Sequence, residues 1–270
     1  MTAGSKERPV GLICAIPQEL AALRDALDHD EQIAVGDFRF DRGRLDGRAV
    51  VLAEAGIGKV NTAAVSTLLG DRFGAGVLVF SGVAGGLDPA LAIGDVVLAT
   101  HAIQHDAGVI EDERLQTYQA GHVPFFNPTR ELGYAVEPAL LARVRAQLEG
   151  LELAPLSAAA GGSGRAPRLV FGTILAGDQF INCEATRERL HRELQAQAVA
   201  MEGGAMAQVA ARLGVPWLEI RALSDLAGKE SHFDFARFVE EVAQSSALIL
   251  RHLLPVWEFD RIPGCGMMSE

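Results

Sequence analysis

Short, continuous apolar runs alternate along this chain with segments of helical periodicity. The run over residues 10–16 is apolar throughout, which is typical of a strand buried on both faces. Pro17 then suits the first turn of a helix whose Leu20, Leu23 and Leu27 lie on one face. Strands separated by helices favour a sheet with helices on both sides. The sequence therefore predicts an α/β fold, a three-layer αβα sandwich around a mixed central sheet.

The same alternation continues to the C-terminus. Further strands are expected at residues 38–45, 49–55, 76–80, 95–100, 169–176, 198–201 and 217–222, and further helices at 59–69, 185–195, 205–213 and 235–254. The Ala- and Gly-rich segment 150–168 is expected to be a mobile surface loop inside the domain. We expect a single domain over residues 1–270, with loose termini at residues 1–9 and 262–270.

Charge and cysteine content exclude several functions. The net charge is −11 and no cluster of Lys and Arg is present, which argues against nucleic-acid binding and against binding to anionic membranes. No signal sequence is visible, and no stretch approaches the roughly 20 apolar residues of a membrane span. Cys14, Cys183 and Cys265 are scattered and odd in number, which indicates free thiols in a reducing compartment. We expect a cytoplasmic protein.

Three carboxylates follow three of the predicted strands. Glu19 lies just past the first strand, Glu202 follows residues 198–201, and Asp225 follows the strand that ends at Ala222. Ligands of open α/β sheets bind outside the carboxyl ends of the strands, so these acids could converge on one crevice. Glu19 could instead stabilise a helix N-terminus, Glu202 could cap the next helix, and Asp225 could close a turn. Asp225, behind apolar neighbours, is a candidate general acid.

Two glycine-rich segments also follow predicted strands. Residues 55–60 open a helix, so their backbone N–H groups could face an anion or a polar ligand, although a tight strand-to-helix turn is an equal alternative. This segment matches neither a P-loop nor a dinucleotide fingerprint. In residues 81–86, the small side chains would let a ligand approach the backbone closely.

Metal and thiol chemistry are less well supported. His101, His105 and Asp106 have ligand-like spacing, but no further protein ligand is evident nearby. His105 and Asp106 are expected to line a pocket wall or to form a loop hydrogen bond. Cys14 lies inside an apolar strand and Cys265 in a tail, which argues against a thiol nucleophile. We expect neither a metal ion nor a cofactor.

Six motifs occur in a recognisable order: GLICAIPQE (residues 11–19), AGIGKVN (55–61), SGVAGGL (81–87), GDQFIN (177–182), AME (200–202) and RALSD (221–225). Over residues 10–254 the chain therefore resembles the 5′-methylthioadenosine/S-adenosylhomocysteine nucleosidases of the nucleoside phosphorylase superfamily. The resemblance implies a nucleoside phosphorylase-like fold. It also implies hydrolysis of the N-glycosidic bond of adenine nucleosides, without metal or cofactor, to adenine and a 5′-modified ribose.

The resemblance implies roles for individual residues. Asp225 matches the general acid that donates a proton toward N7 of adenine, which requires a protonated carboxyl group near neutral pH, and Ser224 would position it. Glu19 matches the acid that activates or orients water at the anomeric carbon, and Arg221 would hold both Glu19 and the water. Glu202 matches the carboxylate that accepts from the 2′- and 3′-hydroxyl groups of the ribose.

The resemblance also implies the remaining substrate contacts. Phe180 would stack on adenine, the main chain of Ile181 would read its edge, and Met201 and Phe235 would pack against the sugar and the 5′-substituent. Further substrate-binding residues are expected at Ile57, Val83, Ala84 and Gly85. The 5′ pocket of the family is completed by a neighbouring subunit, so a homodimer is implied, and residues 109–126 are expected to contribute to it.

Some positions depart from the family pattern. Val83 replaces a common Ser, Ala200 replaces a common acid, and Ile16 replaces a common Met. None of these is one of the three carboxylates, but together they leave open a related substrate, such as another 5′-modified adenosine or a futalosine-type nucleoside. A phosphorylase is a second alternative, although Glu19 would repel phosphate. A non-catalytic nucleoside-binding protein on the same fold is a third.

Overall fold

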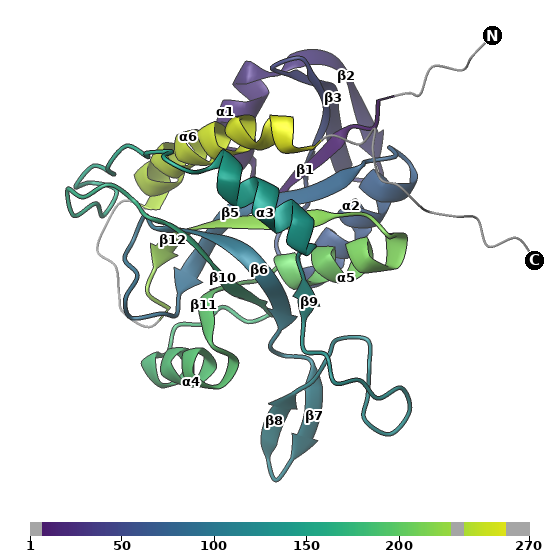
Figure 1. Cartoon of the computed structure of the whole chain (residues 1–270), viewed down its shortest axis with the longest axis vertical. Helices are drawn as coiled ribbons and strands as arrows, with labels where there is room; N and C mark the ends of the chain where they lie inside the picture. The colour runs from purple at the N-terminus through teal and green to yellow at the C-terminus, as the bar shows by residue number, and fades with distance from the viewer. Residues whose placement is uncertain (1–6, 228–234, 258–270) are drawn as a thin grey trace, which may run out of the picture.

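The computed structural model describes residues 7–227 and 235–257, and a mixed ten-stranded sheet runs through them (Figure 1). The order of its strands is β11-β10-β6-β12-β5-β1-β4-β3-β2, with β9 paired to β6. The strands are β1 (Val10–Cys14), β2 (Asp28–Val35), β3 (Phe38–Leu45), β4 (Arg48–Glu54), β5 (Val77–Gly86), β6 (Val96–Gln104), β9 (Tyr134–Ala135), β10 (Leu169–Ala176), β11 (Ala196–Ala200) and β12 (Trp217–Asp225). A separate hairpin is formed by β7 (Gly108–Glu111) and β8 (Arg114–Thr117).

Helices cover both faces of this sheet. The helices α1 (Pro17–Ala26) and α6 (Phe235–Leu253) pack together, and α2 (Lys59–Asp71) packs against α5 (Gly203–Leu213) on the opposite face (Figure 1). The other helices are α3 (Pro138–Gln147), α4 (Glu184–Leu194) and a 3-10 turn (Leu254–Val256). The predicted αβα sandwich with a mixed central sheet is confirmed. None of the described helices has both the length and the apolar character that spanning a membrane requires.

The pairing of the strands determines where a ligand can bind. β4, β1, β5 and β12 are parallel neighbours, so their carboxyl ends lie at one edge of the sheet. β11 pairs with β10 on one side and, through Val199 and Ala198, with Gly85 and Gly86 of β5 on the other. This part of the sheet therefore closes on itself, and the ends of β5, β11 and β12 meet.

Most of the predicted strands and helices are present within a few residues of their expected limits, but β5, β6 and β12 extend beyond their expected ends. β5 continues through Gly86, so residues 81–86, expected to follow a strand that ends at residue 80, are part of that strand, because this segment pairs with β12 and β11 to its end. β12 likewise includes Ser224 and Asp225, expected to lie in a loop. The register of β12 on β5 shifts between Leu223 and Asp225, which makes Ser224 the extra residue of a β-bulge.

Other elements gave no clear signal in the sequence. β2 is polar and largely exposed, since it pairs only with β3 at the edge of the sheet. Residues 150–168 contain neither helix nor strand, as expected, yet Leu153, Leu156 and Ala160 are buried in the core, so the prediction of a surface loop is wrong for this part. Asp95, also buried, accepts hydrogen bonds from Arg165 and Arg168 and anchors the segment. Residues 1–6 and 262–270, expected to be loose, lie outside the described residues.

Candidate active site

A cavity of about 570 Å³ lies where the ends of β5, β11 and β12 meet. Its volume is within the range of small-molecule sites, and its walls are apolar apart from a few charged groups. The lining residues are Ala15, Ile16, Glu19, Ile57, Val83, Ala84, Gly85, Phe180, Asn182, Val199, Ala200, Met201, Glu202, Arg221, Ser224 and Asp225. The three carboxylates predicted from three distant parts of the sequence are therefore brought together.

Only two of the predicted site residues are absent from this lining. Ile181 lies beside a small adjoining cavity that shares Phe180 and Asp225 with the main one. Phe235 is the first residue of α6, but its side chain lies outside the described residues. Five lining residues had not been predicted as site residues: Ala15, Ile16, Asn182, Val199 and Ala200. All five lie within, or next to, the six motifs of the sequence.

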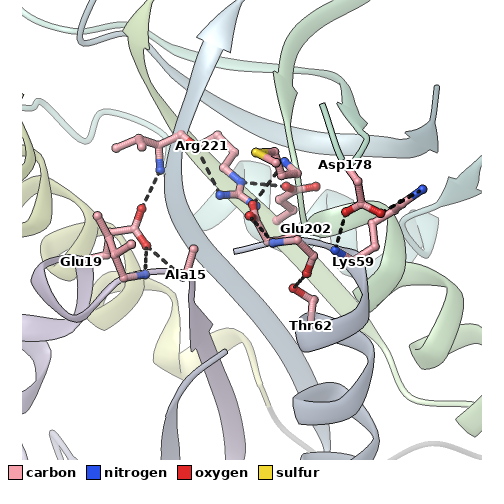
Figure 2. Close-up of polar contacts among 12 residues, drawn as sticks. Ala15, Glu19, Lys59, Thr62, Asp178, Glu202 and Arg221 are labelled. Atoms are coloured by element: carbon pink, nitrogen blue, oxygen red, sulfur yellow. Dashed lines mark hydrogen bonds and ion pairs between the residues drawn. The ribbon is translucent and has the colours of Figure 1, made fainter. Parts of the chain in front are cut away.

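Glu19 is buried in the first turn of α1, and three backbone N–H groups hold its carboxylate (Figure 2). Oε2 accepts from Ala15 at 2.9 Å and from Ile16 at 3.2 Å, and Oε1 accepts from Val83 at 3.1 Å. Burial raises the pKa of Glu19, opposed by the positive charge of Arg221 and by these donors. Glu19 also stabilises the N-terminus of α1, the alternative role considered above, because its side chain accepts from the backbone N–H of the N-cap residue Ile16.

Arg221 is the centre of a buried charge cluster. Its Nη2 donates to Glu202 Oε2 at 3.0 Å, its Nε to Glu219 Oε1 at 2.8 Å, and its Nη1 to the carbonyl oxygen of Val83 at 3.2 Å. The guanidinium carbon lies 4.3 Å from the centre of the Phe80 ring. Burial opposes the charge of Arg221, but the carboxylates of Glu219 and Glu202 raise its pKa, so the guanidinium stays charged.

The cluster differs from the expected one in two ways. Arg221 forms no hydrogen bond or ion pair with Glu19 among the contacts of the described residues, because all three of its nitrogens point to other oxygens. It acts on Glu19 only through its charge. Glu219, which was not predicted as a site residue, accepts a hydrogen bond from Arg221 instead. The sequence signal for Glu219 was an acid inside an otherwise apolar strand.

Glu202 lies at the N-cap of α5, yet its side chain does not cap that helix. Oε1 accepts from the N–H of Gly58 at 3.1 Å, and Oε2 accepts from the N–H of Met201 at 3.2 Å as well as from Arg221 (Figure 2). Gly58 has a φ of +97°, a conformation that favours glycine. The anion faced by the glycine-rich segment 55–60 is therefore a carboxylate of the protein itself.

A second charged group fixes the loop that carries Phe180. Asp178 Oδ1 accepts from the backbone N–H of Lys59 at 2.9 Å, and the N–H of Asp178 donates to Asp106 Oδ2 at 2.9 Å. The Lys59 ammonium lies 2.6 Å from Asp106 Oδ1 and 3.8 Å from Asp178 Oδ2. The loop after β10 is thus tied to the start of α2, next to Gly58.

The residues considered for metal binding are dispersed. Asp106 forms the expected loop hydrogen bonds, His105 is buried with a pKa lowered by burial, and His101 is exposed. Within residues 7–227 and 235–257, no group of three His, Cys, Asp or Glu side chains is placed to hold a metal ion. Burial raises the pKa of the Cys14 thiol, which keeps it protonated.

Asp225 is half-buried and is oriented by two hydrogen bonds. Ser224 Oγ donates to Asp225 Oδ2 at 2.9 Å, and the N–H of Ala227 donates to Asp225 Oδ1 at 2.7 Å. The hydrogen bond from Ala227 closes a turn, as the sequence allowed for Asp225, and the carboxyl group still lines the cavity. At the mouth, Phe180 is 75% exposed and Ile57 is 57% exposed, so these apolar side chains are available to a ligand.

Comparisons with known proteins found a matching family model and similar sequences and structures. Residues 9–255 match the family model described as the phosphorylase superfamily. A 5′-methylthioadenosine/S-adenosylhomocysteine nucleosidase of Mycobacterium tuberculosis is 60% identical, covering 92% of this chain and 97% of its own. The solved structure of such a nucleosidase from Colwellia psychrerythraea, in complex with adenine, is 31% identical with a TM-score of 0.77, covering 93% and 96% of the two chains. A futalosine hydrolase of Helicobacter pylori is 28% identical with a TM-score of 0.74, covering 92% and 97%.

Proposed function

The chain belongs to the phosphorylase superfamily and, within it, to the 5′-methylthioadenosine/S-adenosylhomocysteine nucleosidases, and we propose that it hydrolyses the N-glycosidic bond of nucleosides of this type. The products are adenine and a 5′-modified ribose. The observation that carries the proposal is the convergence of Glu19, Glu202 and Asp225 on one cavity. Three carboxylates there can supply the acid, the water-handling group and the sugar ligand that the reaction requires.

The departing base needs a proton. Breaking the N-glycosidic bond leaves an oxocarbenium-like ribose and an electron-rich adenine, so a general acid lowers the barrier. We assign this role to Asp225, directed toward N7 of adenine. The hydrogen bonds from Ser224 and from the N–H of Ala227 support the assignment, because they restrict the carboxyl group to one orientation at the cavity wall.

The nucleophile is water, and we assign its activation to Glu19. Both carboxylate oxygens are held by backbone donors, which fixes the group relative to the sugar. The pKa of Glu19, raised by burial, makes the carboxylate a stronger base than an exposed glutamate. Arg221 would contribute its charge and the placement of Glu202 rather than a direct bond to Glu19.

The sugar and the base have separate ligands in this proposal. Glu202 accepts hydrogen bonds from the 2′- and 3′-hydroxyl groups, since a carboxylate can receive two donors from adjacent carbons. Phe180 stacks on adenine and the main chain of Ile181 reads its edge. Met201 packs against the sugar, with Phe235 as a further candidate whose side chain lies outside the described residues. Ile57 and the β5 residues Val83, Ala84 and Gly85 complete the wall.

Hydrolysis is favoured over phosphorolysis by the charges at the cavity. Arg221 is the only cation among the described lining residues, and each of its nitrogens already donates to a protein oxygen. The nearby Lys59 ammonium pairs with Asp106. A phosphate ion would therefore meet Glu19 without a free positive partner, which costs free energy.

A related nucleoside is the second candidate substrate. The similarity to a futalosine hydrolase structure extends over nearly the whole chain. The higher identity to the Mycobacterium tuberculosis nucleosidase favours 5′-methylthioadenosine and S-adenosylhomocysteine as substrates. Measuring KM for a panel of nucleosides that differ at the 5′ position distinguishes these two substrate classes. The nucleoside with the preferred 5′-substituent should have the lowest KM.

The deciding experiment measures adenine release from 5′-methylthioadenosine in phosphate-free buffer and again with millimolar phosphate. Equal release in both, with free sugar as the second product, is expected. Release only with phosphate would assign the chain to the phosphorylases and contradict the role of Glu19. Release from a futalosine-type nucleoside but not from 5′-methylthioadenosine would change the substrate and leave the reaction type intact.

We further propose that residues 1–270 form one domain and that the protein acts as a homodimer in the cytoplasm, in methionine salvage. Ile110 on the β7–β8 hairpin and Phe125 and Phe126 beyond it are 75%, 87% and 82% exposed, and this region projects from the body of the protein (Figure 1). Exposed apolar groups of this size mark a contact surface. A second copy of the chain is the partner we assign to it. The free thiols of Cys14 and Cys183 fit a reducing compartment.

A further inference from the structure

Glu219 is a buried acid with no direct access to the cavity. It lies in the middle of β12, is 0% exposed, and is not a lining residue. Oε1 accepts from Arg221 Nε at 2.8 Å, whereas Oε2 has no hydrogen-bond partner among the described residues. Burying a carboxyl group in this way costs free energy that an apolar residue of similar size would not. Stability of the strand therefore does not explain why an acid stands here.

Space for this carboxyl group is provided by one glycine. A Cβ atom at Gly203 would lie 1.9 to 2.1 Å from the two oxygens and the carboxyl carbon of Glu219, far closer than any real contact. Gly203 directly follows Glu202 in the chain and is the first residue of α5. The carboxyl group of Glu219 thus lies against the backbone that carries Glu202, and Glu219 does not line the cavity.

The contact with Glu219 determines how the guanidinium of Arg221 is oriented. Side chains two residues apart in a strand lie on the same face, so Glu219 meets Nε of Arg221. A planar guanidinium that is held at Nε and stacked on Phe80 can direct its two other nitrogens only along fixed lines. One of these lines leads to Glu202 Oε2 and the other to the carbonyl oxygen of Val83.

Resting on the function proposed above, we propose that Glu219 is a positioning residue for recognition of the ribose diol, which it serves by fixing Arg221 so that Glu202 presents its carboxylate to the two hydroxyl groups. Without Glu219, Nε of Arg221 loses its acceptor and the guanidinium is free to turn. Arg221 can then form a two-pronged pair with Glu202, which occupies the oxygens that the ribose would use.

The test compares Glu219→Val and Glu219→Gln with the unaltered protein on 5′-methylthioadenosine and on its 2′-deoxy counterpart. For Glu219→Val we expect kcat/KM on the ribonucleoside to fall about 10- to 100-fold, the equivalent of one charge-assisted hydrogen bond, and to fall less than about 3-fold on the 2′-deoxy substrate. Glu219→Gln keeps an acceptor for Nε, so it should retain most of the preference for the ribonucleoside.

A structural role alone would give a different pattern. Equal losses on both substrates, or no loss on either, would overturn the proposal. Thermal unfolding of both variants serves as the control: Glu219→Val leaves Nε of the buried Arg221 without its acceptor and should lower the melting temperature, whereas Glu219→Gln keeps an acceptor and should lower it less. The 2′-deoxy substrate separates this loss of stability from a positioning role, because a less stable protein would lose activity equally on both substrates.

Calorimetric binding separates this proposal from the proposed function. The probes are a C-nucleoside of adenosine, whose carbon–carbon glycosidic bond cannot be hydrolysed, and its 2′-deoxy form. If the unaltered protein fails to release adenine, the function is wrong, but the difference in affinity between the two probes still tests Glu219. The unaltered protein should favour the ribose form, and Glu219→Val should lose that preference. Absence of any preference in the unaltered protein would overturn the inference.

Discussion

Ser224 and Asp225 are neighbours in β12 and also hydrogen-bond partners, since Ser224 Oγ donates to Asp225 Oδ2 at 2.9 Å. The other carboxylate oxygen accepts from the N–H of Ala227 at 2.7 Å. The carboxyl group is therefore held from both sides while it faces the cavity. The two hydrogen bonds restrict the orientation of the carboxyl group at the cavity wall, which suits the general-acid role that we propose for it.

Asp225→Asn should abolish turnover and spare binding. The amide keeps the shape and the contact with Ser224 but has no acidic proton, so kcat should fall about 100- to 10,000-fold. Adenine release and calorimetric binding of adenine measure the two effects. Ser224→Ala is the matched variant and should lose less than Asp225→Asn, because it removes only the restraint. Full activity of Asp225→Asn would exclude it as the acid.

Glu19 should make stability depend on pH. Burial raises the pKa of Glu19 above the ordinary value of 4.5, so between these two values the folded chain retains a proton that the unfolded chain releases. Stability contributed by this group therefore decreases as pH rises through that window. Glu19→Gln removes the decrease. Its melting temperature relative to the unaltered protein should rise as pH increases above 4.5, although its activity is lost. A constant difference across this range would contradict the raised pKa.

The link between Asp178 and Lys59 should matter for both stability and binding. Asp178 accepts from the first N–H of α2, a position where such an acceptor contributes about 1 kcal/mol. Asp178→Ala should lower the free energy of unfolding by about this amount. It should also raise KM, because the loop that carries Phe180 loses its anchor. Urea unfolding and steady-state kinetics measure the two effects. Asp178→Asn keeps an acceptor and should show a smaller change in both.

Gly203→Ala should be destabilising only while Glu219 is present. Gly203 does not have the positive φ that requires glycine, but an added methyl group would collide with the buried Glu219 carboxyl group. We expect a loss of about 1 to 3 kcal/mol in the free energy of unfolding. In a Glu219→Val background the same change should become stabilising by about 0.4 to 1 kcal/mol. A double-mutant cycle by urea unfolding measures this reversal, and additive effects would show that the two sites are independent.

The proposed homodimer can be tested at Phe126. Phe126→Asp places a charge on the exposed apolar surface beyond the β7–β8 hairpin and should convert the dimer to a monomer in sedimentation velocity. KM for 5′-methylthioadenosine should rise in parallel if a second subunit completes the 5′ pocket. Leu248→Asp, on α6 at the opposite end of the molecule, is the control and should remain dimeric (Figure 1). A monomeric unaltered protein would refute the proposal.

The sequence predicted those parts of the fold in which local pattern and final environment agree. β3 and β10 have the expected limits, because buried strands need apolar residues throughout or on alternate positions. β2 was missed because an edge strand exposed to water has no such constraint. Residues 81–86 were expected to follow the strand rather than to extend it, because they are rich in glycine, whereas pairing on both sides keeps them extended.

The site, like the fold, could be predicted only where a local sequence pattern marks a residue. Glu19, Glu202 and Asp225 could be selected because each stands at the end of an apolar run. Their meeting in one cavity depends on strand order, which the sequence does not display. The partners of Arg221 could not be derived either, since the choice of Glu219 over Glu19 depends on the room left by Gly203.

The bulge at Ser224 also changes what one strand can present. In a regular strand consecutive side chains point to opposite faces, so a cavity receives only every second residue. Because the pairing of β12 with β5 slips at this point, Ser224 and Asp225 both reach the same cavity. The site therefore depends on which residues of β12 point to each face of the sheet as well as on their side chains. An insertion or deletion of one residue in this strand could remove the acid from the cavity without altering a single functional group.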